Sequence, residues 1–267
     1  MSVTEKLQLV QSLFQETQQR IKDNSVESVL KQYDGEFLSI VYEAIAVHLA
    51  TLDLKLEDNS FSLWNNFLIK HGALHGSQIH VGLGWALSEM NVTDISILPS
   101  FTSTWRWRVL DGYGYHSGLF KRREAIRSQQ VPPFIIQEDI HAFNQGIGRS
   151  LWYTSKGDIE RLLRSLNLFD LNRQKGLWRG VGLATSYVGG VDKSTLNNFL
   201  NASGVFAPQL KCGIIMAIAA RKKSGILSTD TNFLSTSLSL ENHYAIDLIF
   251  STSNSYYELI EQIEATL

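Results

Sequence analysis

The chain has 267 residues, of which 44% are hydrophobic and 10% aromatic, so it can bury a large core and is not disordered. Charged residues make up 19% of the chain and the net charge is −2, with no basic stripe and no acidic block. This balance argues against electrostatic binding of nucleic acid or of an anionic membrane surface, so we expect a small or uncharged partner.

The N-terminal segment 1–35 is expected to form a helical cap. Its first residues, "MSVTEKLQLVQSLFQETQQR", carry charges throughout and lack the apolar run of a signal peptide. The longest apolar run, "CGIIMAIAA", has half the length that a membrane span needs. It begins with Cys212, the single cysteine, which we expect to be a core residue of a protein in a reducing compartment. We therefore predict a cytoplasmic protein without a membrane span.

A nine-residue motif with two small residues at alternate positions recurs along the chain. Four copies have paired glycines, namely "GLGWALSEM" from Gly82, "GYGYHSGLF" from Gly112, "GIGRSLWYT" from Gly146 and "GVGLATSYV" from Gly180. Two degenerate copies flank them, "AIAVHLATL" from Ala44 and "GIIMAIAAR" from Gly213. Successive starts are separated by 38, 30, 34, 34 and 33 residues, a period typical of two-helix repeats.

Each repeat is expected to hold a small-residue helix, a turn and a second amphipathic helix. The pattern is clearest where "GIGRSLWYTSKG" is followed by "DIERLLRSLNLF", in which Asp158 can cap the second helix. "DKSTLNNFL" has the same helical spacing, whereas the strand signals in "FIIQ" and "AIDLIF" are weak.

Paired glycines inside a helix cost about 2 kcal/mol against alanine, and close approach of neighbouring backbones is the natural compensation. We predict an all-α protein of about six units of roughly 34 residues, arranged as an α-solenoid or a closed α/α ring. A single domain would comprise the cap 1–35, repeats 36–225 and a C-terminal cap 226–267. A dinucleotide fold is rejected because no strand precedes the glycines, and the phosphate-binding P-loop motif is absent.

Two columns of the aligned repeats lie on one helix face and predict a pocket. These are the residue before the first small position and the residue four further on. The candidates on this face are Glu43, Asp111, Gln145, Arg149 and Arg179, with the rings of Trp85 and Tyr115. The alternative is that these polar groups only form ion pairs between neighbouring repeats. The segment "WRWRVLDGYGYH" holds many aromatic and charged residues close together. Its indoles beside guanidinium groups favour a site for a flat or anionic ligand.

Histidines offer two further possibilities. His116 can exchange protons in concert with Asp111 or Glu43, or it can be a satisfied core histidine. His71 and His75 have the spacing of a metal pair, with His80 close by, but a third ligand is not evident and Gly72 and Gly76 suggest a loop. We predict no metal site and no cofactor, since an aspartate-rich diphosphate motif for Mg²⁺ is also absent. The absence of a nucleophile elbow argues against nucleophilic catalysis.

The chain resembles a bacterial family of unknown function, the UnbL-like proteins that occur beside gene clusters for enediyne polyketides and other natural products. The resemblance rests on "YEAIAVHLA", "IHVGLGWAL", "RVLDGYGYHSGLF", "FNQGIGRSLWY" and "LWRGVGLATSYVGG". It covers roughly Tyr42 to Gly225. The first unit departs from the family, because Ala44 and Ala46 replace the usual glycines. The resemblance implies a setting in secondary metabolism, with a tailoring step on a hydrophobic intermediate.

The function that we expect is metal-independent cyclisation or isomerisation of an apolar polyketide or isoprenoid-like intermediate in a central pocket. Asp111 or Glu43 would donate the proton, with Arg149 and Arg179 holding an anionic or carbonyl group. Gln145 would contact the substrate, and Trp85, Tyr115 and Trp152 would shape the cavity. The alternative is a helical-repeat scaffold that binds a peptide, a carrier protein or a product. The C-terminal "NSYYELIEQIEATL" either caps the last repeat or contacts a second chain in a homodimer.

Overall fold

The computed structural model describes residues 1–57, 60–94, 103–240, 246, 249 and 256–267. Within these residues all regular structure is helical, which confirms the predicted all-α class. The α-helices are α1 (Val3–Asp23), α2 (Val26–Leu30), α3 (Leu38–Lys55), α4 (Ser62–Glu89), α5 (Ser103–Phe120), α6 (Ile140–Ser155), α7 (Ile159–Leu166), α8 (Leu171–Val188), α9 (Lys193–Ser203), α10 (Ala207–Ser224), α11 (Thr229–Ser237) and α13 (Tyr256–Glu264). A π-helical turn, η2 (Arg123–Arg127), and a 3₁₀ turn, η3 (Gly204–Phe206), complete the described helices.

Side-chain caps mark where several helices begin. Ser2 and Glu5 form a reciprocal capping box at the start of α1. Asp158 accepts a hydrogen bond from the backbone N–H of Arg161 at 2.9 Å, which confirms the predicted cap of α7. Asp170 and Asp192 cap α8 and α9 in the same way. Residues within three positions of each helix start therefore mark these boundaries.

The two weak strand signals are not borne out where the structure describes them. "FIIQ" contains turns and no strand. Only Ile246 and Ile249 of "AIDLIF" belong to the described residues; Ile246 is helical and Ile249 lies in a turn.

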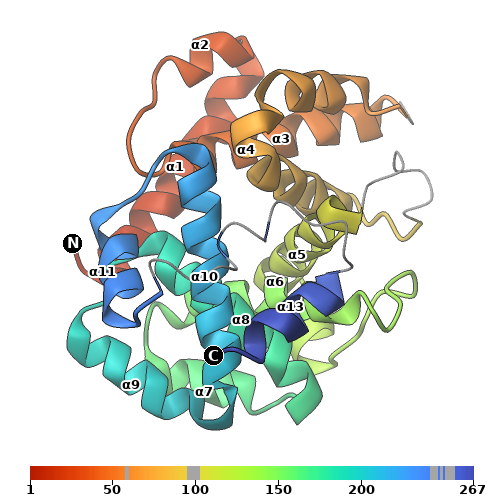
Figure 1. Ribbon diagram of the computed structural model, residues 1–267. Helices are drawn as coiled ribbons and strands as arrows, with labels where there is room; N and C mark the ends of the chain where they lie inside the picture. The colour runs from red at the N-terminus through yellow and green to blue at the C-terminus, as the bar shows by residue number, and fades with distance from the viewer. Residues whose placement is uncertain (58–59, 95–102, 241–245, 247–248, 250–255) are drawn as a thin grey trace.

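The small residues let six helices pack in sequence with their backbones close together. Helices α3, α4, α5, α6, α8 and α10 each pack against the next (Figure 1). A Cβ atom on Gly146 would overlap the carbonyl oxygen of Asp111 in the preceding helix, and one on Gly180 would overlap that of Gln145. At the first small position this relation recurs in α4, α5, α6, α8 and α10. The glycines are therefore needed for close approach, as predicted.

The connections between these helices differ from a uniform two-helix unit. A second α-helix follows the small-residue helix three times among the described residues, as α7 after α6, α9 after α8 and α11 after α10. Between α5 and α6 the connection holds only the π-helical turn η2, and α3 packs directly on α4. Gly72 and Gly76 lie inside α4, so the expected loop at these glycines is wrong.

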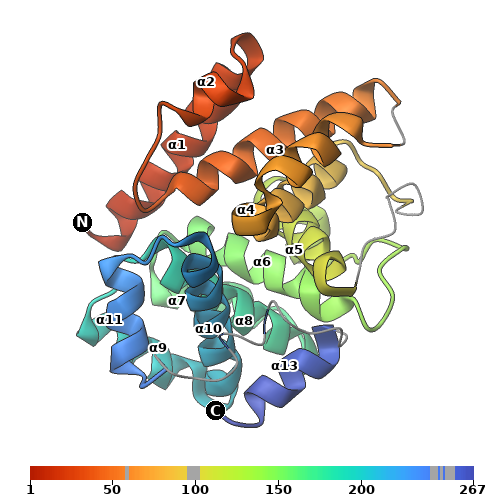
Figure 2. The same ribbon diagram turned by 45° about the horizontal axis from the view of Figure 1, so that its top comes forward.

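The last helix of the series returns to the first. Arg221 of α10 donates a hydrogen bond of 2.7 Å to the carbonyl oxygen of Glu36, just before α3, and its guanidinium lies 5.7 Å from the ring of Phe37. Helix α10 also contacts α4, and α1 lies alongside α3 (Figure 2). Helix α10, the last of the series, therefore lies beside the start of α3 as well as beside α8.

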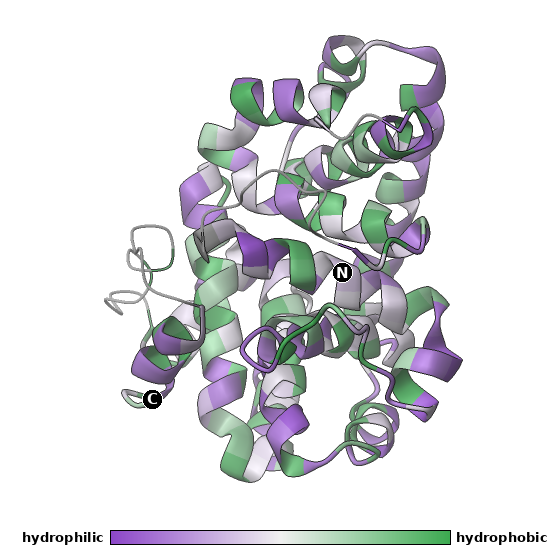
Figure 3. Cartoon of the chain, turned by 90° about the vertical axis from the view of Figure 1, so that its right-hand side faces the viewer, coloured by the Kyte–Doolittle hydropathy of each residue, from purple (hydrophilic) through white to green (hydrophobic). Residues whose placement is uncertain are grey.

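The small-residue segments are buried on all faces of their helices, as over His75–Ser88 of α4 and Gly176–Val188 of α8. Hydrophobic and hydrophilic residues alternate along most helices of the chain (Figure 3). One helical stretch, Lys193–Ser224, is long and apolar enough to cross a membrane by composition, but 61% of its apolar window is buried inside the protein. Cys212 is fully buried within this stretch, and burial raises the pKa of its thiol to about 12, so it is the core residue that we expected.

Candidate functional site

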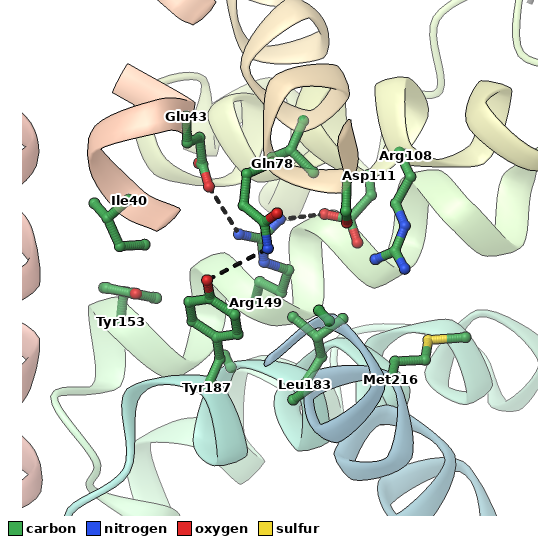
Figure 4. Close-up of a pocket in the computed structure, with 15 residues that line it drawn as sticks. Ile40, Glu43, Gln78, Arg108, Asp111, Arg149, Tyr153, Leu183, Tyr187 and Met216 are labelled. Carbon is green, nitrogen blue, oxygen red and sulfur yellow. Dashed lines mark hydrogen bonds and ion pairs between the residues drawn. The ribbon is translucent and has the colours of Figure 1, made fainter. Parts of the chain in front are cut away.

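A small pocket lies at the centre of the helix series. Each of the six helices contributes to its lining, from Ile40 and Glu43 of α3 to Met216 of α10 (Figure 4). Its cavity volume is only about 30 Å³, because charged and amide side chains extend into it. This space suits one or two water molecules and is too small for a drug-sized ligand.

The polar core of the pocket is a cluster of two carboxyl groups and one guanidinium, Glu43, Asp111 and Arg149. Arg149 pairs with the Oδ1 atom of Asp111, and its Nη2 atom lies 3.9 Å from Oε2 of Glu43. Gln145 donates a hydrogen bond to the other oxygen of Asp111. Asp111 is 1% exposed and Glu43 4% exposed, so these charges interact in a medium of low dielectric.

The electrostatics give the two acids different surroundings. Burial raises the pKa of Glu43, Arg149 lowers it and the neighbouring Asp111 raises it, and together they bring this pKa to about 7. Burial lowers the pKa of Arg149, but Asp111 and Glu43 outweigh it and hold that pKa above its ordinary value. Glu43 is therefore a carboxyl group that can gain or lose a proton near neutral pH, beside a permanent cation.

A larger cavity of about 470 Å³ adjoins the central pocket beneath α1. The two share the side chains of Ile40, Glu43, Arg149 and Tyr153, so the charged cluster separates them. Phe14, Trp85, Tyr115 and Phe120 form an aromatic wall, in which the rings of Phe14 and Trp85 are 4.8 Å apart. A volume of this size suits a drug-sized apolar ligand.

Most of the predicted site residues come together here. Glu43, Asp111 and Arg149 line the central pocket, and Trp85 and Tyr115 line the larger cavity with Glu43 and Arg149. Tyr115 also packs against the cation, since the guanidinium of Arg149 lies 4.3 Å from its ring centre. Gln145 lies directly behind Asp111, where it accepts a hydrogen bond of 2.6 Å from the hydroxyl of Tyr256.

Arg179 does not join the cluster. It is 1% exposed and donates to Oε1 of Glu264 in α13, with 2.9 Å from Nε and 2.5 Å from Nη2. The guanidinium of Arg179, which we predicted to contact the substrate, is thus paired with a carboxylate of the C-terminal helix and lies outside the lining of both cavities. That helix packs on its own chain, against α10 and α5.

Trp152 and His116 are core residues in this structure. Trp152 is fully buried and packs edge-on against Phe199 of α9 at 5.0 Å, away from the lining of both cavities. His116 accepts or donates a hydrogen bond of 2.9 Å with Ser88 and lies against Trp85. Burial lowers the pKa of His116 to about 4, which makes it neutral at neutral pH. Neither residue lines the predicted pocket.

The other histidines pack against aromatic rings. His75 stacks on Tyr42 with ring centres 3.8 Å apart, and His80 stacks on Trp105 at 4.5 Å. In the described part of the chain, groups of three or more His, Cys, Asp or Glu side chains suited to a metal ion are absent.

Several lining residues were missed by the two sequence columns, although a signal for them exists. Arg108 and Gln78 lie four residues before the first small position of their helices, and Tyr153 and Tyr187 lie seven residues after it. These positions continue the same helix face by one turn in each direction. Burial lowers the pKa of Arg108 to about 9, while Asp111 raises it and Arg149 lowers it.

The lining positions also explain why some residues of the two predicted columns lie outside the pocket. Helices α3, α4 and α5 contribute residues before the small pair, whereas α6, α8 and α10 contribute residues after it. The pocket therefore crosses the helices obliquely. Residues that precede the small pair in α6 and α8, namely Gln145 and Arg179, lie beyond its edge.

These observations define an all-helical protein with a buried carboxylate–guanidinium cluster between two cavities. The chain belongs to the family described as a protein of unknown function (DUF1702), whose model matches residues 6–254. Neither a curated protein nor a solved structure matches the chain.

Proposed function

We propose that this protein is an enzyme that binds an apolar ligand in the larger cavity and transfers protons to and from it through Glu43. The observation that carries the proposal is a buried carboxyl group, with its pKa raised to about 7, on the shared wall of an aromatic cavity. A catalytic acid is most effective when its pKa lies near the working pH.

The chemistry that we propose is isomerisation or cyclisation. Protonated Glu43 adds its proton to an alkene or carbonyl group of the ligand, and loss of a proton from another carbon returns it to the Glu43 carboxylate. Atoms and electrons balance without an oxidant or a second substrate. The rings of Trp85 and Tyr115 stabilise positive charge that develops on the ligand, because aromatic faces attract cations. Arg149 and Asp111 remain an ion pair that keeps the acid in place.

We also infer that the six small-residue helices form a closed ring of repeats, with the outer helices α7 and α9 as remnants of the second helix of each unit. The recurring glycine register and the contacts of Arg221 beside Phe37 support this inference. The resemblance to UnbL-like proteins supports a setting in natural-product biosynthesis, with a polyketide or isoprenoid-like substrate.

Deuterium incorporation tests the proposal without knowledge of the natural substrate. Farnesol, geranylgeraniol and curcumin are first titrated against the protein by tryptophan fluorescence. Ligands that bind are then incubated in D₂O and analysed by mass spectrometry. We expect wild type to give an isomer carrying one deuterium and Glu43→Gln to give none, while the exposed control Glu16→Gln behaves as wild type.

The second candidate is a binding protein that holds the same ligand without chemistry. It is favoured by the size of the larger cavity, which suits a ligand whether or not a proton moves. Ligands that bind wild type but gain no deuterium would support this candidate over the enzyme.

A further inference from the structure

Helix α1 presents a row of glutamines to the larger cavity. Gln8, Gln11, Gln15 and Gln18 are spaced by three, four and three residues, so they lie on one face of the helix. All four line the cavity, together with Gln19. The cavity therefore has an amide-bearing wall on α1.

Three of these amides are available to a ligand. Gln18 donates a hydrogen bond to the carbonyl oxygen of Ala44, which fastens α1 to α3. Gln8, Gln11 and Gln15 are exposed and make no hydrogen bond within the part of the chain that the structure describes. A glutamine amide offers both donor and acceptor atoms without a charge.

The other walls differ in chemistry. Trp85 lies edge-on to Tyr115 at 5.3 Å and to Phe120 at 5.6 Å, which makes a continuous aromatic surface. The cations on the described lining are Arg149, which is paired with Asp111, and Lys156, which is exposed at the end of α6. An anionic ligand would thus have to pair with Lys156 at the rim.

We propose that the ligand of this cavity is a flat apolar molecule with uncharged oxygen groups along one edge. Its hydroxyl, ether or carbonyl oxygens bind Gln8, Gln11 and Gln15, while its apolar face packs on Trp85 and Tyr115. This inference rests on the proposed function for the location of the ligand, and it adds the class of substrate. Polyhydroxylated or glycosylated aromatic and polyketide-like compounds fit this description, whereas pure hydrocarbons leave the amide wall unused.

Three naphthalene probes that differ only in their substituent test the proposal. They are 2-naphthyl β-D-glucopyranoside, 2-naphthyl sulfate and 2-ethylnaphthalene, titrated against wild type by calorimetry. We expect wild type to bind the glucoside at least about tenfold more tightly than the sulfate, because two or three amide hydrogen bonds form. Tighter binding of the sulfate, or no binding of the glucoside, would overturn the proposal.

A pair of double variants assigns the preference to the amides. Gln11→Leu/Gln15→Leu is expected to weaken glucoside binding about tenfold and to leave 2-ethylnaphthalene binding unchanged. Ser12→Leu/Glu16→Leu is the matched control, because Ser12 and Glu16 lie on the same turns of α1 but not on the cavity lining. Equal losses in the two double variants would show that the amides do not bind the oxygens. Circular dichroism before titration ensures that only folded protein is compared.

The Glu43→Gln variant separates this inference from the proposed function. Glucoside binding that persists in Glu43→Gln, with deuterium incorporation lost, supports both. A wild type that prefers the glucoside but gives no deuterated product with any bound ligand overturns the enzyme and leaves the ligand class standing. Proton transfer without a preference for the glucoside overturns only the ligand class.

Discussion

At the scale of single residues, Glu43 combines burial with two charged neighbours of opposite sign. Arg149 stabilises its carboxylate and Asp111 destabilises it, yet burial outweighs the attraction and the pKa rises to about 7. Asp111 accepts hydrogen bonds from both Arg149 and Gln145. The two acids of the central pocket thus have different partners. Glu43 is suited to exchange protons, and Asp111 is suited to hold the Arg149 cation.

The raised pKa makes a prediction about stability. The unfolded carboxyl loses its proton near pH 4.5, while the folded one keeps it until about pH 7. Wild type therefore loses unfolding free energy as pH rises from about 4.5 to 7. Glutamine cannot ionise, so we expect Glu43→Gln to gain up to about 3 kcal/mol relative to wild type between pH 5 and pH 8.

Urea unfolding at several pH values measures this difference. The buried neutral histidines, such as His116, destabilise both proteins equally as pH falls, so they cancel in the comparison. Glu16→Gln, at an exposed position, should show no such pH-dependent gain. A constant difference between Glu43→Gln and wild type would contradict the shift.

At the scale of helices, glycines determine how closely the backbones pack. A Cβ atom on Gly84 of α4 would overlap the carbonyl oxygen of Val109 in α5, and backbone atoms cannot turn aside. A Cβ atom on Gly72 of the same helix would meet only the flexible end of Leu68, at 2.8 Å. The two positions therefore provide a test and its matched control within one helix.

We expect Gly84→Ala to lower the free energy of unfolding by about 2 kcal/mol or more, because α4 and α5 must move apart. Gly72→Ala should be neutral or stabilising by up to about 1 kcal/mol, since alanine favours the helix. Thermal and urea unfolding of the two variants and of wild type measure these changes in the free energy of unfolding. Equal effects at the two sites would show that close approach does not limit the packing.

At the scale of the whole molecule, elements from both ends of the chain pack on the six small-residue helices. Helix α1 forms one wall of the larger cavity, and its buried Lys6 pairs with Glu36 and Asp230 at 2.9 and 2.5 Å. Helix α13 packs on the other side, where Tyr256 donates to Gln145 and Glu264 pairs with Arg179. The C-terminal helix is thereby connected to Asp111 through Gln145.

The ion pair between Arg179 and Glu264 leads to a prediction about how much α13 contributes to the stability of the fold. Glu264→Leu leaves the buried guanidinium of Arg179 without its carboxylate, so we expect a loss of about 3 kcal/mol in unfolding free energy. The double variant Arg179→Met/Glu264→Leu should recover most of that loss, because an apolar pair replaces the uncompensated charge. Glu261→Leu, exposed on the same helix, is the control. A double variant no more stable than Glu264→Leu would contradict this account.

The larger part of the fold was predictable from local and periodic signals. Caps at Ser2, Asp158 and Asp170 depend only on the next few residues, and the small residues recur at nearly constant spacing. The site was predictable in part, because Glu43, Asp111 and Arg149 lie on the helix face that the columns define. Trp152 lies away from both cavities, and His116 is the core histidine that was one of its two predicted roles, because residue type alone does not show what packs around a side chain.

By itself, the sequence determined the helical class, several helix boundaries and the points of backbone contact, since these follow from capping, periodicity and the missing Cβ of glycine. Only the tertiary structure decided which turns of each helix reach the centre, because the helices cross the pocket obliquely. It also decided that Glu264 forms an ion pair with Arg179 and that the glutamines of α1 face the larger cavity. Such contacts join segments far apart in the chain, and their geometry depends on how all the inner helices pack.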